Sequence, residues 1–320
     1  MTDKTRYYLG IDIGGTNTVV AVTDEAHALR SKGSFPTRPE RGYDIVISEI
    51  GELSYELISG LGLKMSDIGS VGVGSPNVID GVVENSVNLS WVNVPLKAEL
   101  ERLFGIPVYV DNDANVAAFG EYIAGAAIGA SSVLMVTIGT GVGGGFITDG
   151  RVYSGCNRAA LEVGHMVIYQ NGRPCACGRF GCFERYASAT GLILTAKEYA
   201  DAYMDSLLWK LCDGNPERIT GKMIFEAMHE GDYAATEAVG AFIRDLSCGI
   251  INLINIFQPE VLLIGGGVAE AGDELFEPLI HRVKQEIITR DSSRNTIIKP
   301  TKLGSDAGVI GAACLHLENK

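Results

Sequence analysis

The most compact group of potential metal ligands lies between Glu162 and Glu184, where EVGH is followed by CACGRFGCFE. One histidine and three cysteines complete a tetrahedral zinc site and leave no position open for a substrate, so such a site is structural. Reduced thiols gathered by chance are the alternative, which the tight C-x-C-x₄-C spacing disfavours. The predicted zinc ligands are His165, Cys175, Cys177 and Cys182.

A glycine turn near the N-terminus, DIGGTN, has the composition of a phosphate-binding loop. Its two glycines let the backbone turn tightly and bring amide N–H groups close to an anion. An acid beside phosphates needs a cation between them, and the Mg²⁺ that ATP carries is the natural one. A hairpin turn with an incidental acid is the alternative. The predicted nucleotide-binding residues here are Asp12, Gly14, Gly15, Thr16 and Asn17.

A second turn, GTGVGGG, formally matches the dinucleotide fingerprint G-x-G-x-x-G. That fingerprint requires a helix to begin within the glycines, whereas the chain continues as FITDGRVY, a strand and a turn. A dinucleotide site is therefore disfavoured, and no P-loop motif occurs. A third glycine turn follows the apolar strand 261–264. The further nucleotide-binding candidates are Gly139, Thr140, Gly141, Gly143, Gly265, Gly266 and Gly267.

The elements that position these residues repeat. Tyr8–Asp24 and Val133–Asp149 each read as an apolar strand, a glycine turn and a second strand. Helix-like and strand-like stretches alternate after each of them, which favours two α/β domains. We expect helices over 43–60, 114–127 and 233–257 and strands over 70–74 and 261–264. The predicted first domain spans 1–111, with a C-terminal helix at about 305–320 packing back on it, and the second spans 112–304 and carries the zinc site.

The composition of the 320 residues narrows the classes of function. A formal charge of −13 without a basic patch argues against nucleic acid as a partner. No signal peptide and no stretch of about 18 apolar residues is evident, so we expect a soluble cytoplasmic protein without a membrane partner. The remaining cysteines, Cys156, Cys212, Cys248 and Cys314, are expected to be core thiols.

Together the three glycine turns resemble the phosphate-1, phosphate-2 and adenosine elements of the actin, Hsp70 and sugar kinase superfamily. This resemblance implies a two-domain α/β, ribonuclease H-like fold with ATP in an interdomain cleft. EVGH followed by CxCGxxGCxE, with DIGGTN, SPNVID and DNDANVAAFGE upstream, is similar to the ROK family of kinases and repressors. The likeness covers essentially the whole chain.

The ROK resemblance implies roles for particular side chains. Asn112 and Asp113 would bind the sugar, with Asp113 as the catalytic base. The other implied sugar ligands are Glu162, His165 and Glu184, and Asn88 in NLSW, which is close to the family's NLPW. The zinc would fix the loop that carries sugar ligands. Where the family commonly has Pro-Gly this chain has Pro76-Asn77, and asparagine tolerates the left-handed conformation that glycine supplies.

These features predict an ATP-dependent hexose kinase that requires Mg²⁺ and converts D-glucose to glucose 6-phosphate. Fructose, mannose, allose, N-acetylglucosamine and N-acetylmannosamine are alternative substrates, and polyphosphate is an alternative phosphoryl donor. A ROK-type sugar-responsive repressor is a less favoured alternative, because DIGGTN begins so early that no winged helix is expected ahead of it. A sugar-binding module without activity would be expected to lack Asp113 or the phosphate loops. The family resemblance implies a homodimer or homotetramer.

Overall fold

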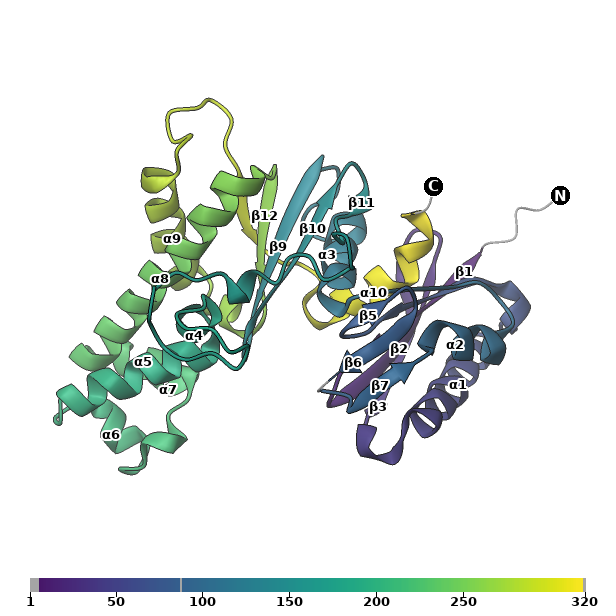
Figure 1. Cartoon of the computed structure of the whole chain (residues 1–320), viewed down its shortest axis with the longest axis horizontal. Coiled ribbons are helices and arrows are strands. Elements are labelled where there is room, and N and C mark those ends of the chain that lie inside the picture. Colours follow the sequence, from purple (N-terminus) through teal and green to yellow (C-terminus); the bar gives the residue numbers. More distant parts are fainter. Residues whose placement is uncertain (1–5, 87, 319–320) are drawn as a thin grey trace. The chain divides into compact units, whose positions relative to one another are not determined.

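The computed structural model describes residues 6–86 and 88–318 and contains two compact units (Figure 1). Unit 1 consists of 1–134, 145–161 and 301–320, and unit 2 of 135–144 and 162–300. Both units therefore contain segments that are far apart in the sequence. This partition differs from the two predicted domains, whose boundary near Asp111 stays a prediction.

Unit 1 is built on a five-stranded sheet with the order β3-β2-β1-β4-β8. Strands β1 to β3 pair antiparallel, whereas β4 and β8 run parallel to β1. The strands are β1 (Tyr7–Ile13), β2 (Asn17–Asp24), β3 (Leu29–Pro36), β4 (Ile68–Gly74) and β8 (Val108–Asp111). The glycine turn predicted around Asp12 is thus the β1–β2 hairpin, and the parallel strands end at the same edge as this turn.

Successive side chains of a strand point to opposite faces of the sheet, and the two faces of this sheet contact different helices of unit 1. Leu9 and Ile11 belong to the buried cluster that includes residues of α1. Gly10 and Gly72 face α10 instead, where a Cβ would lie 2.0 Å from the Val309 carbonyl and 1.7 Å from the Ala312 carbonyl, respectively. Only glycine permits this approach. The helices of this unit are α1 (Tyr43–Gly60), α2 (Leu96–Phe104), α3 (Asp113–Ala124) and α10 (Ala307–Cys314).

A small sheet of order β5-β6-β7 also belongs to unit 1. Its strands are β5 (Val78–Ile79), β6 (Val82–Ser86) and β7 (Trp91–Val94). Asn88 lies in the connection between β6 and β7. Asn77, immediately before β5, has φ 55°, so the left-handed conformation expected at this asparagine is confirmed.

The second five-stranded sheet has the order β11-β10-β9-β12-β13, and β9 and β10 contribute residues to both units. Its strands are β9 (Ser132–Ile138), β10 (Val142–Thr148), β11 (Arg151–Val152), β12 (Val261–Gly265) and β13 (Ile297–Pro300). The chain after the second glycine turn is a strand and a turn, as predicted, and the short strand β11 follows. The helical start that the dinucleotide fingerprint requires does not occur there.

Unit 2 carries most of the helices of the second half of the chain. Helix α8 packs against α4, α5, α7 and α9. These helices are α4 (Glu184–Ala187), α5 (Ala189–Ala202), α6 (Leu207–Leu211), α7 (Gly221–His229), α8 (Tyr233–Phe257) and α9 (Asp273–Glu286). Helices α1 and α8 have the ends that the sequence predicted.

Two expectations about individual segments need correction. Helix α8 is long and apolar enough, by length and composition, to cross a membrane, although no such stretch was expected; 56% of the qualifying window is buried inside the protein. Core burial explains its apolar composition. Cys212 and Cys314 are buried as predicted, but Cys156 and Cys248 are exposed. Cys156 lies in a loop, and Cys248 lies on the outer face of α8, which helical periodicity alone does not distinguish from the buried face.

Candidate functional site

The β1–β2 turn is held in a fixed conformation by contacts within unit 1. The Gly14 N–H donates to the Asn17 carbonyl at 3.0 Å, and the Thr37 hydroxyl donates to the Gly14 carbonyl at 2.7 Å. The side chains of Thr16 and Asn17 are exposed, so their polar groups remain available. A Cβ on Gly15 would lie 2.9 Å from the Asn88 carbonyl, which places the predicted sugar contact Asn88 directly beside the predicted phosphate turn.

Asp12 and Asp113 form an acidic pair in the same unit. Burial, together with the negative charge of Asp113, raises the pKa of Asp12 to about 6. A Cβ on Gly308 would lie 2.3 Å from Asp12 Oδ2, so this carboxylate also approaches the start of α10. Asp113 keeps solvent access, but the surrounding protein reduces its hydration and raises its pKa as well. Two acids that are difficult to ionise together favour a bound cation.

The DND motif lies where β8 ends and α3 begins. Asn112 is the N-cap of α3, and its Oδ1 accepts from the N–H groups of Ala114 at 2.9 Å and Asn115 at 3.4 Å. The side chain at the cap position is therefore an amide and not a carboxylate. Asn112 keeps its Nδ2 donor free of this capping role. Asp113 Oδ1 accepts from the Ala114 N–H at 2.8 Å, which leaves Oδ2 for another partner.

In unit 2 the four predicted zinc ligands converge. Their ligand atoms all lie within 4.8 Å of one another. Cys177 Sγ and Cys182 Sγ are 3.6 Å apart, too far for a disulfide, and Cys175 Sγ lies 3.6 Å from His165 Nδ1. Zinc bonds of about 2.3 Å to sulfur and about 2.0 Å to nitrogen give tetrahedral edges of about 3.5 to 3.8 Å. These two separations match the edges of a closed His-Cys₃ zinc site.

The loop that bears the cysteines depends on one close backbone approach. Gly181 has φ 76°, and a Cβ there would lie 1.6 Å from the Tyr169 carbonyl. Burial raises the pKa values of the Cys175 and Cys182 thiols, whereas the Arg179 backbone N–H lowers that of Cys177. Two buried thiols that resist deprotonation need a strong electrophile to become ligands, and a metal cation is one.

The residues beside the cluster are the predicted sugar ligands of unit 2. His165 ends the short 3₁₀ helix η3 (Val163–His165), whose N-cap is Glu162. Its Nδ1 faces the cluster, so Nε2 is the ring nitrogen that remains for another ligand. Glu184 Oε1 accepts from the Cys175 thiol at 3.1 Å, while a Cβ on Gly141 would lie 2.8 Å from Glu184 Oε2. Glu184 therefore links the cysteine cluster to the second glycine turn.

The second and third glycine turns lie side by side. A Cβ on Gly266, which has φ 86°, would lie 2.3 Å from the Ile138 carbonyl, next to Gly139. Gly139 and Thr140 are tied to the start of α5: the Gly139 carbonyl accepts from the Ala189 N–H at 2.9 Å, and the Thr140 carbonyl accepts from the Thr190 hydroxyl at 2.8 Å. Gly143 lies within β10, and Gly267 begins the 3₁₀ helix η5 (Gly267–Ala271).

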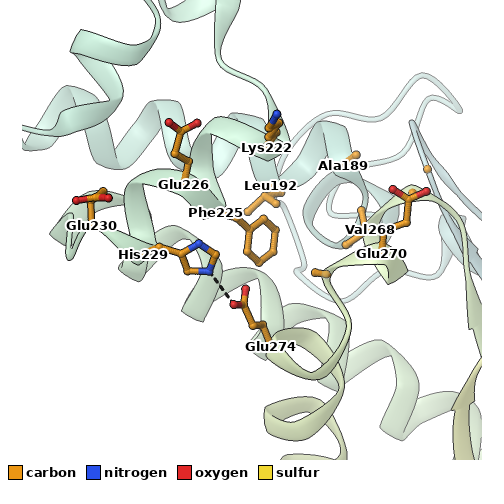
Figure 2. A pocket seen from close by; sticks show the side chains of 14 residues that line it. Ala189, Leu192, Lys222, Phe225, Glu226, His229, Glu230, Val268, Glu270 and Glu274 are labelled. Atoms are coloured by element: carbon orange, nitrogen blue, oxygen red, sulfur yellow. Dashed lines mark hydrogen bonds and ion pairs between the residues drawn. The ribbon is translucent and has the colours of Figure 1, made fainter.

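A pocket of about 760 Å³ opens between these turns and the helices of unit 2. Figure 2 shows Leu192, Phe225 and Val268 among its apolar side chains. His229 of α7 and Glu274 of α9 pair at 2.7 Å. A volume of this size and an apolar lining suit a nucleoside base. Sequence reasoning missed the α5 and α7 contributions, because Leu192 and Phe225 fit the apolar face of an ordinary amphipathic helix.

The predicted site residues thus form two groups, each within one unit. Unit 1 contains the first glycine turn with Asp12, together with Asn88, Asn112 and Asp113. Unit 2 contains the other two glycine turns, the base-sized pocket, the zinc-like cluster, Glu162, His165 and Glu184.

Comparison with known proteins shows the family. The model of the ROK family matches residues 8–319, and the chain belongs to this family. It is 37% identical to the glucokinase of Halalkalibacterium halodurans, over 97% of this chain and 94% of that protein, and 36% identical to the glucokinase of Thermotoga maritima, over 97% of each. The crystal structure of a ROK family glucokinase from Streptomyces griseus in complex with glucose and AMPPNP is 33% identical, with a TM-score of 0.77, over 97% of this chain and 98% of that one. The predicted fold class, the two-domain actin-like α/β fold of sugar kinases, is confirmed.

Proposed function

We propose that this protein is an ATP-dependent hexose kinase that acts on glucose, at the 6-hydroxyl. One observation carries the proposal: in unit 1 Asp12 of the phosphate turn pairs in register with Gly74, and a Cβ on Gly74 would lie 3.6 Å from the Cα of Asp113 in the DND motif. Phosphoryl transfer requires the γ-phosphate with its cation and the acceptor hydroxyl to meet. Asp12 on the phosphate turn would hold the cation of the γ-phosphate, and Asp113 on the DND motif would hold the acceptor hydroxyl.

The roles of the unit 1 residues follow from their free atoms. Asn112 Nδ2 would donate to a sugar hydroxyl, while Asp113 Oδ2 would accept from the hydroxyl that attacks the γ-phosphate and then take its proton. Since the transition state of phosphoryl transfer is loose, the proton leaves late, and a carboxylate suffices as the base. Asn88, beside Gly15, would contact the sugar near the phosphate turn. Asp12 would hold Mg²⁺, directly or through water, and the turn 14–17 would bind phosphate.

The unit 2 residues supply base, phosphate and sugar contacts. The apolar pocket would receive adenine, with Gly265 to Gly267 along the nucleoside and Gly139 to Gly143 along the phosphates. Glu162, Glu184 and His165 Nε2 would pair with sugar hydroxyls, because a sugar presents alternating donors and acceptors. His165 Nδ1, Cys175, Cys177 and Cys182 would bind a structural zinc. That ion would fix the His165 ring and the loop that precedes Glu184.

We also propose that the protein is soluble and cytoplasmic and forms a homodimer or homotetramer. It would have no nucleic acid or membrane partner. The negative net charge of −13 argues against binding to nucleic acid, whose phosphate backbone is also negative. A different hexose as the substrate is the main alternative. Hexose epimers differ in the orientation of one hydroxyl, so small shifts of the pocket side chains decide which epimer binds.

The test is a coupled assay of the zinc-loaded protein with Mg-ATP over a panel of glucose, fructose, mannose, allose and the two N-acetylated amino sugars, repeated with polyphosphate as donor. We expect glucose with ATP to give the highest kcat/KM. A panel with no turnover would refute the kinase, and a strong preference for another sugar would refute glucose as the substrate.

A further inference from the structure

Arg158 contacts two of the sequence motifs of unit 1, although the sequence assigns it no role. It lies in the segment between β11 and Glu162. Its Nε donates to Asp80 Oδ1 at 3.0 Å, and its Nη1 lies 3.8 Å from Asp111 Oδ2. Asp80 belongs to SPNVID, and Asp111 is the first residue of DNDAN. One guanidinium thus spans two segments that are well separated in the sequence.

Asp111 is a buried carboxylate that accepts hydrogen bonds from the start of α3. Its side chain is 3% exposed, and its Oδ1 accepts from the Asn112 N–H at 2.6 Å and from Asn115 Nδ2 at 3.0 Å. These bonds fix the backbone of Asn112 and the first turn of α3. Among the residues that the structure describes, Arg158 is the basic side chain within ion-pair distance of Asp111. A buried carboxylate without such a partner is costly and tends to become protonated.

We propose that Arg158 is a positioning residue for the kinase reaction: its charge keeps Asp111 ionised, and ionised Asp111 fixes Asn112 and Asp113 against the sugar. The inference rests on the proposed function, since it assigns the same sugar-binding role to the DND motif. Bonds to an ionised acceptor are about twice as strong as bonds to a neutral one, so protonation of Asp111 loosens both Oδ1 contacts. Sugar binding suffers first, because ATP has its own contacts in unit 2.

Other charged groups face the same space. A pocket of about 440 Å³ is lined by Asp80, Lys97, Tyr109, Asp111, Arg158 and Glu318. Burial raises the pKa of Asp111, while Asn115, Asn112 and Arg158 act in the opposite direction. Burial and the negative charge of Asp111 raise the pKa of Glu318. Lys97 lies within reach of Glu101, at 3.9 Å, rather than of Asp111. Removing Arg158 therefore raises the pKa of Asp111 further.

The test compares Arg158→Gln, Arg158→Lys and a control, Arg30→Gln, which breaks the Arg30–Asp24 pair at 3.7 Å in the same unit. Glucose KM, ATP KM, kcat and melting temperature are measured from pH 6 to pH 8. For Arg158→Gln we expect glucose KM to rise about tenfold, the scale of one weakened charge-assisted hydrogen bond, with ATP KM unchanged. Arg158→Lys should restore most of the affinity, and Arg30→Gln should match the wild type.

The two pH trends of Arg158→Gln run in opposite directions. The stability deficit is greatest at high pH, where the unpaired Asp111 is ionised, and shrinks as the pH falls and Asp111 takes up a proton. The glucose KM defect grows as the pH falls, because neutral Asp111 holds Asn112 less firmly. A purely structural role would make both defects largest at the same pH. Equal trends, or a glucose KM equal to that of the wild type, would overturn the inference.

The proposed function is judged separately by the wild type. If the wild-type protein turns over no hexose, the kinase and the positioning role both fail, whereas the pH trend of the melting temperature still reports whether Arg158 holds Asp111 ionised. If the wild type is active and Arg158→Gln is indistinguishable from it, only the inference fails.

Discussion

Asp113→Asn separates catalysis from helix capping, because the structure assigns the N-cap of α3 to Asn112 and not to Asp113. Asparagine retains an Oδ1 that can accept from the Ala114 N–H, as Asp113 does at 2.8 Å. Loss of one negative charge at a helix N-terminus costs about 0.3 to 1 kcal/mol. That cost is offset in part, because burial disfavours the charged form of Asp113 and raises its pKa. We therefore expect the free energy of unfolding to change by less than about 1 kcal/mol.

The effect of this substitution on turnover should be much larger. Asparagine cannot take the proton of the attacking hydroxyl, and loss of a general base lowers kcat by about 10² to 10⁴. Even a 10²-fold loss equals about 2.7 kcal/mol of transition-state stabilisation, which exceeds the expected change in stability. Glucose affinity should weaken only modestly, because one acceptor oxygen remains and Asn112 is intact.

The measurements for Asp113→Asn are steady-state kinetics, calorimetric titration with glucose and thermal unfolding. Asp44→Asn is a matched control, since Asp44 is an exposed acid in the first turn of α1 in the same unit; its turnover should equal that of the wild type. The raised pKa of Asp113 also predicts that wild-type kcat falls on the acid side at a pH above the usual aspartate range. Near-normal turnover of a folded, zinc-loaded Asp113→Asn protein would refute the assignment of the base.

Three further perturbations test the other parts of the site. Cys177→Ser should lower the zinc content, measured by elemental analysis, from one per chain to nearly none, and should lower the melting temperature. The control Cys156→Ser, at an exposed cysteine outside the cluster, should keep its full zinc content. Equal zinc contents in both variants would contradict the His-Cys₃ site. Asp12→Asn should abolish most turnover yet stabilise the nucleotide-free protein at pH 8. A pKa of about 6 in the folded protein, against the ordinary aspartate value of 3.8, makes ionised Asp12 destabilising by up to about 3 kcal/mol. This gain should vanish as pH falls through 6 to 4, and a pH-independent change in melting temperature would count against it. Phe225→Ala should raise ATP KM about tenfold and leave glucose KM unchanged, the scale of one aromatic contact; an unaltered ATP KM would exclude Phe225 from the base pocket.

Local features of the sequence were enough to predict many of the elements. The apolar periodicity of 43–60 and 233–257 matches α1 and α8, because a helix that buries one face repeats every 3.6 residues. Glycine pairs after apolar strands marked the hairpin turn at Gly14 and the turn at Gly266. The zinc-like cluster was also predicted, since cysteines a few residues apart lie close together in almost any compact loop.

Contacts between distant segments could not be predicted in this way. Gly15 lies beside Asn88, and Arg158 reaches Asp80 and Asp111, only because strands and loops that are far apart in the sequence are joined in one unit. The apolar pattern of α7 likewise gave no sign that Phe225 lines a pocket, because periodicity identifies the buried face of a helix but not what that face contacts.

The sequence by itself therefore determined the ROK family and the glycine turns, and it was enough to predict the His-Cys₃ cluster and to propose Asp113 as the base. Those features depend on residue type and short spacing, which can be identified in the sequence without knowledge of the packing. Only the tertiary structure decided that Asn112 caps α3, that burial and the charge of Asp113 disfavour ionised Asp12, and that Arg158 is the counterion of Asp111. These depend on side-chain direction and burial, which are fixed when distant segments pack together and exclude water.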